Sequence, residues 1–427
     1  MGAWVKKHYH WVIAIVVLLE MSVYVGFLNN LTSLHLVPVT EELNISRGSF
    51  SLAISMKHLV GFFTTMVSGV LFLKFGYRKL VLGGLFLGSI AYTLLAFSQS
   101  AAMLATGTLV MGLLDFACSS TGATKIVGSW FYKYRGTVLG LVSASTGIGG
   151  SIFCIFLNKI ISLYGWRASY GFCAVLVLVM GIVMLFVIRN RPADMGLMPY
   201  GLGHVPKKKP RNSVLRPHWL GLTFGEMLRR PSFYLMLLGT FFSCFCMYMA
   251  FNVVVPHLTD RGLSSADAAA MQSMLLLAMA GAKFLSGLLS DWIGPRAVTM
   301  TCLAASAGAL WLLADVSDTG SAIVAMLFFA WALPATTITV PLLTTSLFGY
   351  QSSDRAIGVF LAMVTLSSMG ATPLANALFD ILGSYSPVFR VCAAATLGIM
   401  VMFVLLYILA ERDKHKFHVG ESMEETV

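Results

Sequence analysis

The stretch GVLFLKFGYR at residues 69–78 returns in altered form as GLLSDWIGPR at residues 287–296. The copies share one spacing pattern, in which a glycine is followed by six residues, a second glycine, one residue and an arginine. The positions that repeat are Gly69, Gly76 and Arg78 in the first copy, and Gly287, Gly294 and Arg296 in the second. Each copy begins near the end of a long apolar run. The repetition therefore predicts a chain built from two similar halves.

The amino-acid composition indicates that the two halves lie in a lipid membrane. Hydrophobic residues make up 57% of the 427 residues and charged residues only 11%, whereas soluble chains average about 45–50% and about 25%. A membrane-spanning helix needs roughly 20 mostly apolar residues, and twelve runs of suitable length can be marked. They are 11–37, 50–73, 80–98, 102–128, 137–163, 169–188, 232–255, 267–290, 297–315, 320–347, 356–379 and 387–410. We therefore expect an all-α membrane protein with twelve transmembrane helices in two six-helix, pseudo-symmetric halves, since helices satisfy their own backbone hydrogen bonds in lipid.

The longest break between apolar runs divides the chain. It predicts an N-terminal half at 1–188, a linker at 189–231, a C-terminal half at 232–411 and a tail at 412–427. The formal net charge is +11, and most cations fall in the linker, the termini and the loops on the same side. The positive-inside rule then places both termini in the cytoplasm of a multi-pass protein of the cell membrane. Cations in short loops between apolar runs do not indicate a nucleic-acid partner.

The second copy of the repeat contains an acid, Asp291, and resembles the G-x-x-x-D-R/K-x-G-R-R/K signature of the major facilitator superfamily. In that family the acid and the basic loop are thought to latch the cytoplasmic ends of the helices. The resemblance therefore implies a gating motif formed by Gly69, Gly76, Arg78, Gly287, Asp291, Gly294 and Arg296. Leu73 stands in the first copy where the family has the acid.

Two further motifs narrow the resemblance. Gly165-Trp166-Arg167 opens the sixth apolar run, and RPADMGLMPYG at 191–201 follows it. Both are similar to the monocarboxylate transporter group and the oxalate:formate antiporter family. This resemblance implies a monomeric secondary transporter of a small organic anion, working by alternating access with proton symport or anion exchange. It also implies that a cation on helix 8, here Lys283, engages the substrate carboxylate, while the family's second cation is replaced by Ser33 or Val364.

Ionisable residues inside the apolar runs are candidates in their own right, because a charge at mid-bilayer costs about 2.5–3.5 kcal/mol on insertion scales. We expect Lys283 and Lys57 to bind the substrate. The alternatives are an ion pair for Lys283 and a side chain reaching the outer surface for Lys57. Polar groups of spans 1 and 7 are the other substrate-binding candidates, namely Asn29, Ser33, Tyr248 and Asn252.

Three more intramembrane groups are candidates for proton coupling: Asp115, Glu20 and His58. A carboxyl in apolar surroundings holds a proton more readily, and histidine titrates near neutral pH. The alternatives are a static salt bridge for Asp115, plain packing of a protonated Glu20, and a neutral, hydrogen-bonded His58.

Other functional classes find little support. The sequence has no HExxH, GxSxG or phosphate-binding loop, so we do not expect an enzyme. All seven cysteines lie in apolar runs, as small buried hydrophobes do, and neither a metal nor another cofactor is expected. The main alternative is a transporter of the same fold with a different substrate, namely an efflux carrier of amphipathic drugs or other small molecules.

Overall fold

The computed structural model describes residues 8–201, 221–349 and 352–424. The described residues form helices, with two isolated β-bridges, Phe131 to Tyr200 and Gly221 to Gly349. The N-terminal half contains α2 (Tyr9–Met21), η1 (Ser22–Asn29), α3 (Ser33–Leu43), α4 (Arg47–Met66), α5 (Ser68–Ala96), α6 (Ala101–Gly112), η2 (Asp115–Ala117), α7 (Ser120–Trp130) and α8 (Arg135–Val187). The short helices η3 (Pro192–Met195) and α9 (Phe224–Leu228) follow it. The C-terminal half contains α10 (Pro231–Phe251), α11 (Val254–Asp260), α12 (Ser265–Ile293), α13 (Pro295–Ala314), α14 (Thr319–Ala332), α15 (Pro334–Thr337), α16 (Thr339–Phe348), α17 (Ser353–Leu382) and α18 (Ser386–Glu424).

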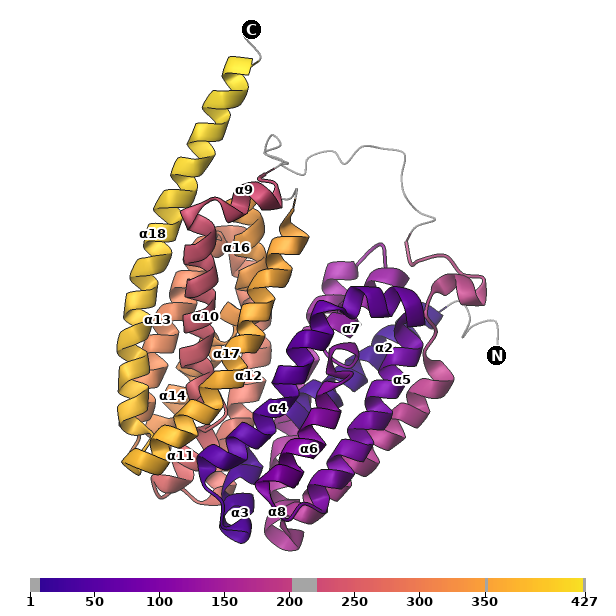
Figure 1. Ribbon diagram of the computed structural model, residues 1–427, viewed down its shortest axis with the longest axis vertical. Helices are drawn as coiled ribbons and strands as arrows, with labels where there is room; N and C mark the ends of the chain where they lie inside the picture. Colours follow the sequence, from indigo (N-terminus) through magenta and orange to yellow (C-terminus); the bar gives the residue numbers. More distant parts are fainter. Residues whose placement is uncertain (1–7, 202–220, 350–351, 425–427) are drawn as a thin grey trace.

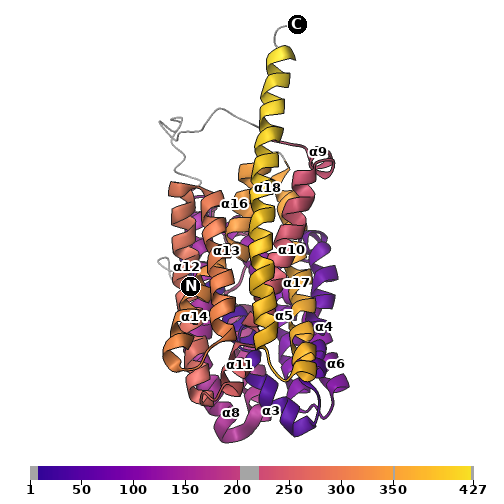
Figure 2. The same cartoon turned by 90° about the vertical axis from the view of Figure 1, so that its left-hand side faces the viewer.

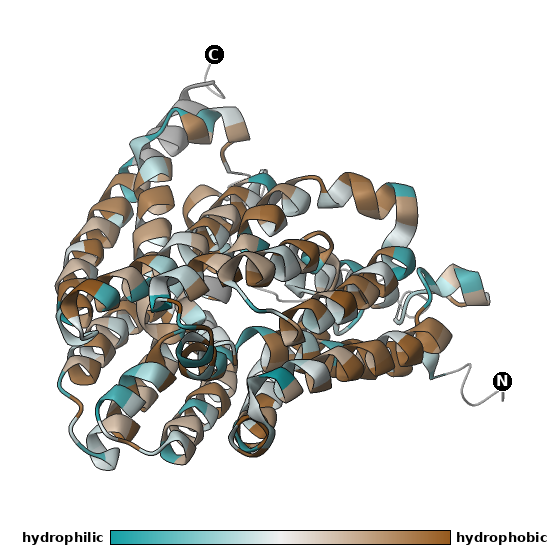
Figure 3. Ribbon diagram, turned by 60° about the horizontal axis from the view of Figure 1, so that its bottom comes forward, coloured by the Kyte–Doolittle hydropathy of each residue, from teal (hydrophilic) through white to brown (hydrophobic). Residues whose placement is uncertain are grey.

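The predicted twelve-span, all-α fold is confirmed. Eight helices of the described residues are long and apolar enough to cross a bilayer, and one of them, α8, turns at Gly165 (φ 81°, ψ 169°) and supplies two spans. The remaining spans are α4 and the two broken pairs α6–α7 and α14–α16. Large apolar side chains such as Phe86, Phe186 and Val401 are exposed, and Figure 3 shows hydrophobic residues along the helices. An apolar outer surface of this kind is expected for helices that contact the hydrocarbon core of a bilayer.

The sequence repeat corresponds to one repeated backbone turn. Gly76 (φ 76°, ψ 160°) and Gly294 (φ 87°, ψ 151°) adopt nearly the same conformation, in a region that only glycine reaches at low cost. The arginine two residues later ties each turn to the last span of its half. Arg78 donates to the Leu185 carbonyl at 2.8 Å, and Arg296 donates to Glu411 at 2.6 Å.

Several spans of the described residues are not continuous α-helices. The first widens into the π-helix η1, the fourth breaks between α6 and α7, and the tenth breaks between α14 and α16. Pro334 and Pro341 in the tenth span explain its break, because proline lacks an N–H and clashes with the preceding turn. The break in the fourth span lies at Asp115, in the 3₁₀ turn η2, where our sequence interpretation had expected a continuous helix.

The two halves meet at one end of the molecule and diverge at the other (Figure 1), and Figure 2 shows the C-terminal half in front of the N-terminal half. We call the end at α3 and α11 the closed end, and the end at α7, α9 and α16 the open end. The helices α4 and α8 pack against α17 and α12 across the boundary between the halves. Close approach depends on Gly147 of α8, where an added Cβ would lie 2.4 Å from the Leu276 carbonyl oxygen.

Candidate functional site

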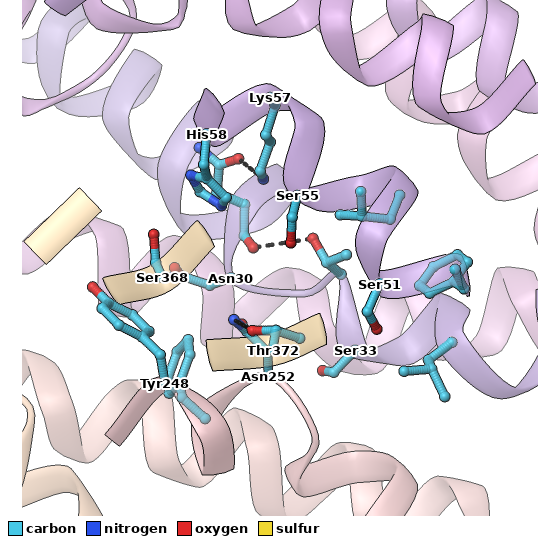
Figure 4. Close-up of a pocket in the computed structure, with 16 residues that line it drawn as sticks. Asn30, Ser33, Ser51, Ser55, Lys57, His58, Tyr248, Asn252, Ser368 and Thr372 are labelled. Atoms are coloured by element: carbon cyan, nitrogen blue, oxygen red, sulfur yellow. Dashed lines mark hydrogen bonds between the residues drawn. The ribbon is translucent and has the colours of Figure 1, made fainter. Parts of the chain in front are cut away.

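A cavity of about 190 Å³ lies between the two halves. In Figure 4, Lys57 and His58 lie on one side of the pocket, and Tyr248 and Asn252 lie on the other. Most of the residues that line it carry polar side chains. The N-terminal half contributes Asn29, Asn30, Thr32, Ser33, Leu36, Phe50, Ser51, Ile54, Ser55, Lys57 and His58, and the C-terminal half contributes Tyr248, Phe251, Asn252, Ser368 and Thr372.

Lys57 supplies a positive charge at this cavity. It is 6% exposed, and its ammonium donates to the side-chain oxygen of Asn29 at 2.7 Å. In the described part of the chain the ammonium makes no direct ion pair. A buried charge without a direct partner is costly.

Other cavity groups are placed to hold a polar ligand. The Ser33 hydroxyl is buried and has no hydrogen-bond partner among the described residues. On the opposite wall the Asn252 amide donates to the Thr372 hydroxyl at 2.8 Å, and the Tyr248 ring packs near Phe251. His58 follows Lys57 directly and is half-buried.

Asp115 lies behind Lys57, at the break in span 4. The Tyr24 hydroxyl donates to one Asp115 carboxylate oxygen at 3.0 Å. The Asn29 side chain lies close to Asp115, and Lys57 interacts with Asp115 electrostatically. Asn29 therefore links the cation at the cavity to the buried acid behind it.

Glu20 lies deeper in the N-terminal half. It is 1% exposed, and neither carboxylate oxygen has a hydrogen-bond partner within the described ranges. It interacts electrostatically with Asp115 and with Tyr77, whose hydroxyl is also unpaired among the described residues. The two acids of the N-terminal half thus form one electrostatic group.

Lys283 lies elsewhere. Its ammonium is 3.5 Å from the Thr146 hydroxyl, on the boundary between α12 and α8, and it does not line the cavity. The structure therefore places one of the two predicted substrate lysines at the cavity and the other at the contact between halves. In the gating motif, Gly76 packs against Asn190, while the side chain of Asp291 lies outside the described residues.

Several cavity residues were not predicted: Asn30, Ser51, Ser55 and Thr372. A sequence signal exists for two of them. Ser51, Ser55 and His58 recur at i, i+4 and i+7 in an apolar run, so they share one helix face. A polar stripe on a membrane helix indicates a face turned to a cavity or to another helix.

Comparison with known proteins agrees with the fold. The family model described as Major Facilitator Superfamily matches residues 12–350 and 236–425. Two solved structures have similar folds. One is a bacterial homologue of the human lysosomal transporter Spinster, inward-facing and unoccupied, with TM-score 0.70, 17% identity, and 95% of this chain and 98% of that chain covered. The other is a variant of the nucleoside transporter NupG, with TM-score 0.71, 13% identity, and coverage of 93% and 100%.

Relatives in sequence include two kinds of transporter. The fujikurins efflux protein of Gibberella fujikuroi is 27% identical over 53% of this chain and 44% of its own length. Human monocarboxylate transporter 2 is 24% identical over 84% of this chain and 78% of its own. Human monocarboxylate transporter 11 is 23% identical, with coverage of 78% and 69%. With a family model that matches nearly all of its length, a twelve-helix fold and transporters as relatives, this chain belongs to the major facilitator superfamily.

Proposed function

We propose that this protein is a secondary transporter of a small organic anion of the monocarboxylate type. It works by alternating access, either as a proton symporter or as an anion exchanger, in the cell membrane with both termini in the cytoplasm. The observation that carries this proposal is the buried ammonium of Lys57, which faces a polar cavity between the halves and makes no direct ion pair with the described residues.

The energetics of this charge suit a transporter. A carboxylate about 4 Å from the ammonium gains roughly 4 kcal/mol at an effective dielectric constant of about 20. Millimolar binding corresponds to about 4 kcal/mol. A single cation supplemented by the Ser33 hydroxyl, which is unpaired among the described residues, therefore supports binding strong enough for capture and weak enough for release.

The arrangement of the halves supports alternating access. They are joined at the closed end and diverge at the open end, which corresponds to a cytoplasm-facing state if the termini are cytoplasmic. Rocking of the halves about the boundary between α8 and α12 would expose the same cavity to the other side. Lys283, which lies on that boundary, is the second cation of the proposed path.

Asp115 is the proposed proton carrier. It reaches the cavity cation through Asn29, so its charge and a substrate anion would compete for Lys57. Protonation of Asp115 would remove this competition and couple proton uptake to anion binding. Glu20 and His58 are the secondary candidates, since one interacts with Asp115 and the other lies beside Lys57.

The alternative function is efflux of amphipathic small molecules, as the name of the Gibberella fujikuroi relative describes for that protein. The cation at the cavity favours the anion. Sites for drug-sized ligands are lined predominantly by hydrophobic and aromatic groups, whereas five of the sixteen residues that line this cavity are hydrophobic or aromatic, namely Leu36, Phe50, Ile54, Tyr248 and Phe251, and Lys57 brings a positive charge to it.

Uptake into proteoliposomes tests the proposal. Labelled formate, acetate, lactate, pyruvate and oxalate are offered with and without an inward proton gradient. We expect accumulation of a monocarboxylate that depends on the gradient or on a preloaded anion. If the folded protein takes up none of the five acids, the proposal is wrong and the efflux alternative is favoured.

A further inference from the structure

An ionic contact joins the two halves at the closed end. The Arg47 guanidinium, at the start of α4, donates to both carboxylate oxygens of Asp260 at 2.6 and 2.8 Å. It also donates to the Tyr385 hydroxyl at 3.2 Å and lies 4.0 Å above the centre of the Phe379 ring. One side chain of the N-terminal half is thus held by three residues of the C-terminal half.

The same helix start is capped by the opposite half. The backbone N–H groups of Arg47 and Gly48 donate to the two carboxylate oxygens of Asp380 at 3.1 and 2.8 Å. The first N–H groups of a helix have no partner within it, so Asp380 of α17 satisfies two donors of α4. We call Arg47, Asp260, Asp380 and Tyr385 the closed-end latch.

Hydrogen bonds lead from this latch to the cavity. The Tyr385 hydroxyl donates to the Asn376 side-chain oxygen at 2.6 Å. The Asn376 amide donates to the Ser51 hydroxyl at 2.8 Å and to the Thr372 carbonyl at 3.1 Å. Ser51 and Thr372 line the cavity, whereas Asn376 is fully buried behind them.

We propose that Asn376 is a positioning residue that couples occupancy of the cavity to release of the closed-end latch. This inference rests on the proposed function. A polar ligand that draws the Ser51 hydroxyl toward itself weakens the bond from Asn376. The freed Asn376 side chain then no longer holds the Tyr385 hydroxyl beside Arg47 through its carbonyl oxygen, and the latch loosens.

The physical basis is that the residues from Ser51 through Asn376 and Tyr385 to Arg47 are buried or half-buried, whereas Asp260 and Asp380, where the route ends, are exposed. A buried donor or acceptor that loses its hydrogen-bond partner costs about 1–3 kcal/mol. Water does not replace the lost partner at a buried position, so the loss of one hydrogen bond shifts the neighbouring side chains of the route. Asn376 is suited to couple the cavity to the latch because its amide group and its carbonyl oxygen bond to different neighbours. The amide contacts Ser51 of the N-terminal half, and the oxygen accepts from Tyr385.

A crosslink at the closed end measures the latch without any substrate. The Ser265 hydroxyl donates to the Asn158 side-chain oxygen at 2.9 Å across the boundary between the halves, outside the proposed route. Asn158→Cys and Ser265→Cys are introduced together, and the rate of crosslinking by a short bismaleimide is recorded. All seven natural cysteines are buried.

Ser51→Ala and Asn376→Ala are compared in this background. Loss of one such hydrogen bond corresponds to roughly a fivefold change in the equilibrium constant between the closed and open states. We therefore expect crosslinking to slow by up to about fivefold in Ser51→Ala, and at least as much in Asn376→Ala, which also removes the acceptor of the Tyr385 hydroxyl. Because Asn376→Ala already removes the bond to Ser51, the double variant should slow no further than Asn376→Ala alone. Ser55→Ala is the matched control, since it changes a cavity serine one turn away on the same helix that lies outside the proposed route.

Wild-type crosslinking in folded Ser51→Ala protein would overturn the proposal, as would additive effects in the double variant. Ser51→Ala removes one hydroxyl and keeps Asn376, which guards against misfolding as the explanation. Absence of acid uptake with slowed crosslinking would instead count against the proposed function alone, since crosslinking needs no substrate.

Discussion

The Lys57 ammonium donates a 2.7 Å hydrogen bond to the side-chain oxygen of Asn29. The bond joins α4 to the π-helical end of the first span, where both residues line the cavity between the halves. An amide oxygen orients the ammonium without neutralising it, so the positive charge stays available to an anion. Asn29 also lies close to Asp115, which places a titratable acid near the lysine that we propose as the substrate cation.

Lys283→Ala should separate transport from binding. The residue contacts Thr146 across the boundary between the halves and does not line the cavity. We therefore expect the rate of acid uptake to fall about tenfold, which corresponds to an increase of roughly 1.4 kcal/mol in the transport barrier. The affinity of the solubilised protein for the acid should change less than about twofold, or roughly 0.4 kcal/mol. Lys159→Ala, an exposed lysine on α8, is the control. Equal losses of binding and uptake would show that Lys283 contacts the substrate directly.

Asp115→Asn should uncouple transport from protons. The asparagine oxygen still accepts from Tyr24 but cannot take up a proton, so exchange of labelled for unlabelled acid should continue. Accumulation driven by an inward proton gradient should disappear. Asp315→Asn, at an exposed acid paired with Arg390, should retain accumulation. A variant that still concentrates acid on the gradient would exclude Asp115 as the essential carrier.

Gly147→Val should prevent the halves from meeting. An added Cβ would lie 2.4 Å from the Leu276 carbonyl oxygen and 2.9 Å from Ala280, and overpacking of this kind costs about 1–3 kcal/mol. We expect slower crosslinking between cysteines at 158 and 265, and a lower midpoint of thermal unfolding. Gly140→Val is the matched control, since no described residue lies within 4 Å of its added Cβ. Equal behaviour of the two variants would contradict a tight boundary at Gly147.

Much of the fold could be predicted from the sequence because its signals are local. The apolar runs indicated twelve spans, and the repeated glycines and arginines predicted two similar halves. The structure shows that Gly76 and Gly294 form the same turn, whose positive φ restricts the residue type. The break at Asp115 was missed, because it is stabilised by contacts with Tyr24 and Asn29 that come from a distant part of the chain.

The candidate site was predicted in part for similar reasons. Polar residues in apolar runs identified Lys57, Asn29 and Ser33, which the structure brings together at one cavity. The sequence could not reveal that Lys283 lies outside it. The rotation of α12 about its axis depends on which of its residues pack against Gly147 of α8, and that depends on tertiary packing rather than on periodicity.

Binding of labelled acid to purified protein, compared between the natural chain, Lys57→Ala and Lys57→Arg, tests the central claim most directly. Since the charge contributes roughly 4 kcal/mol at an effective dielectric constant of about 20, we predict that Lys57→Ala weakens binding about a hundredfold or more. Lys57→Arg should retain part of the affinity, because it keeps the charge and changes its geometry. Unchanged affinity in folded Lys57→Ala protein would contradict the assignment of Lys57 as the cation that binds the substrate.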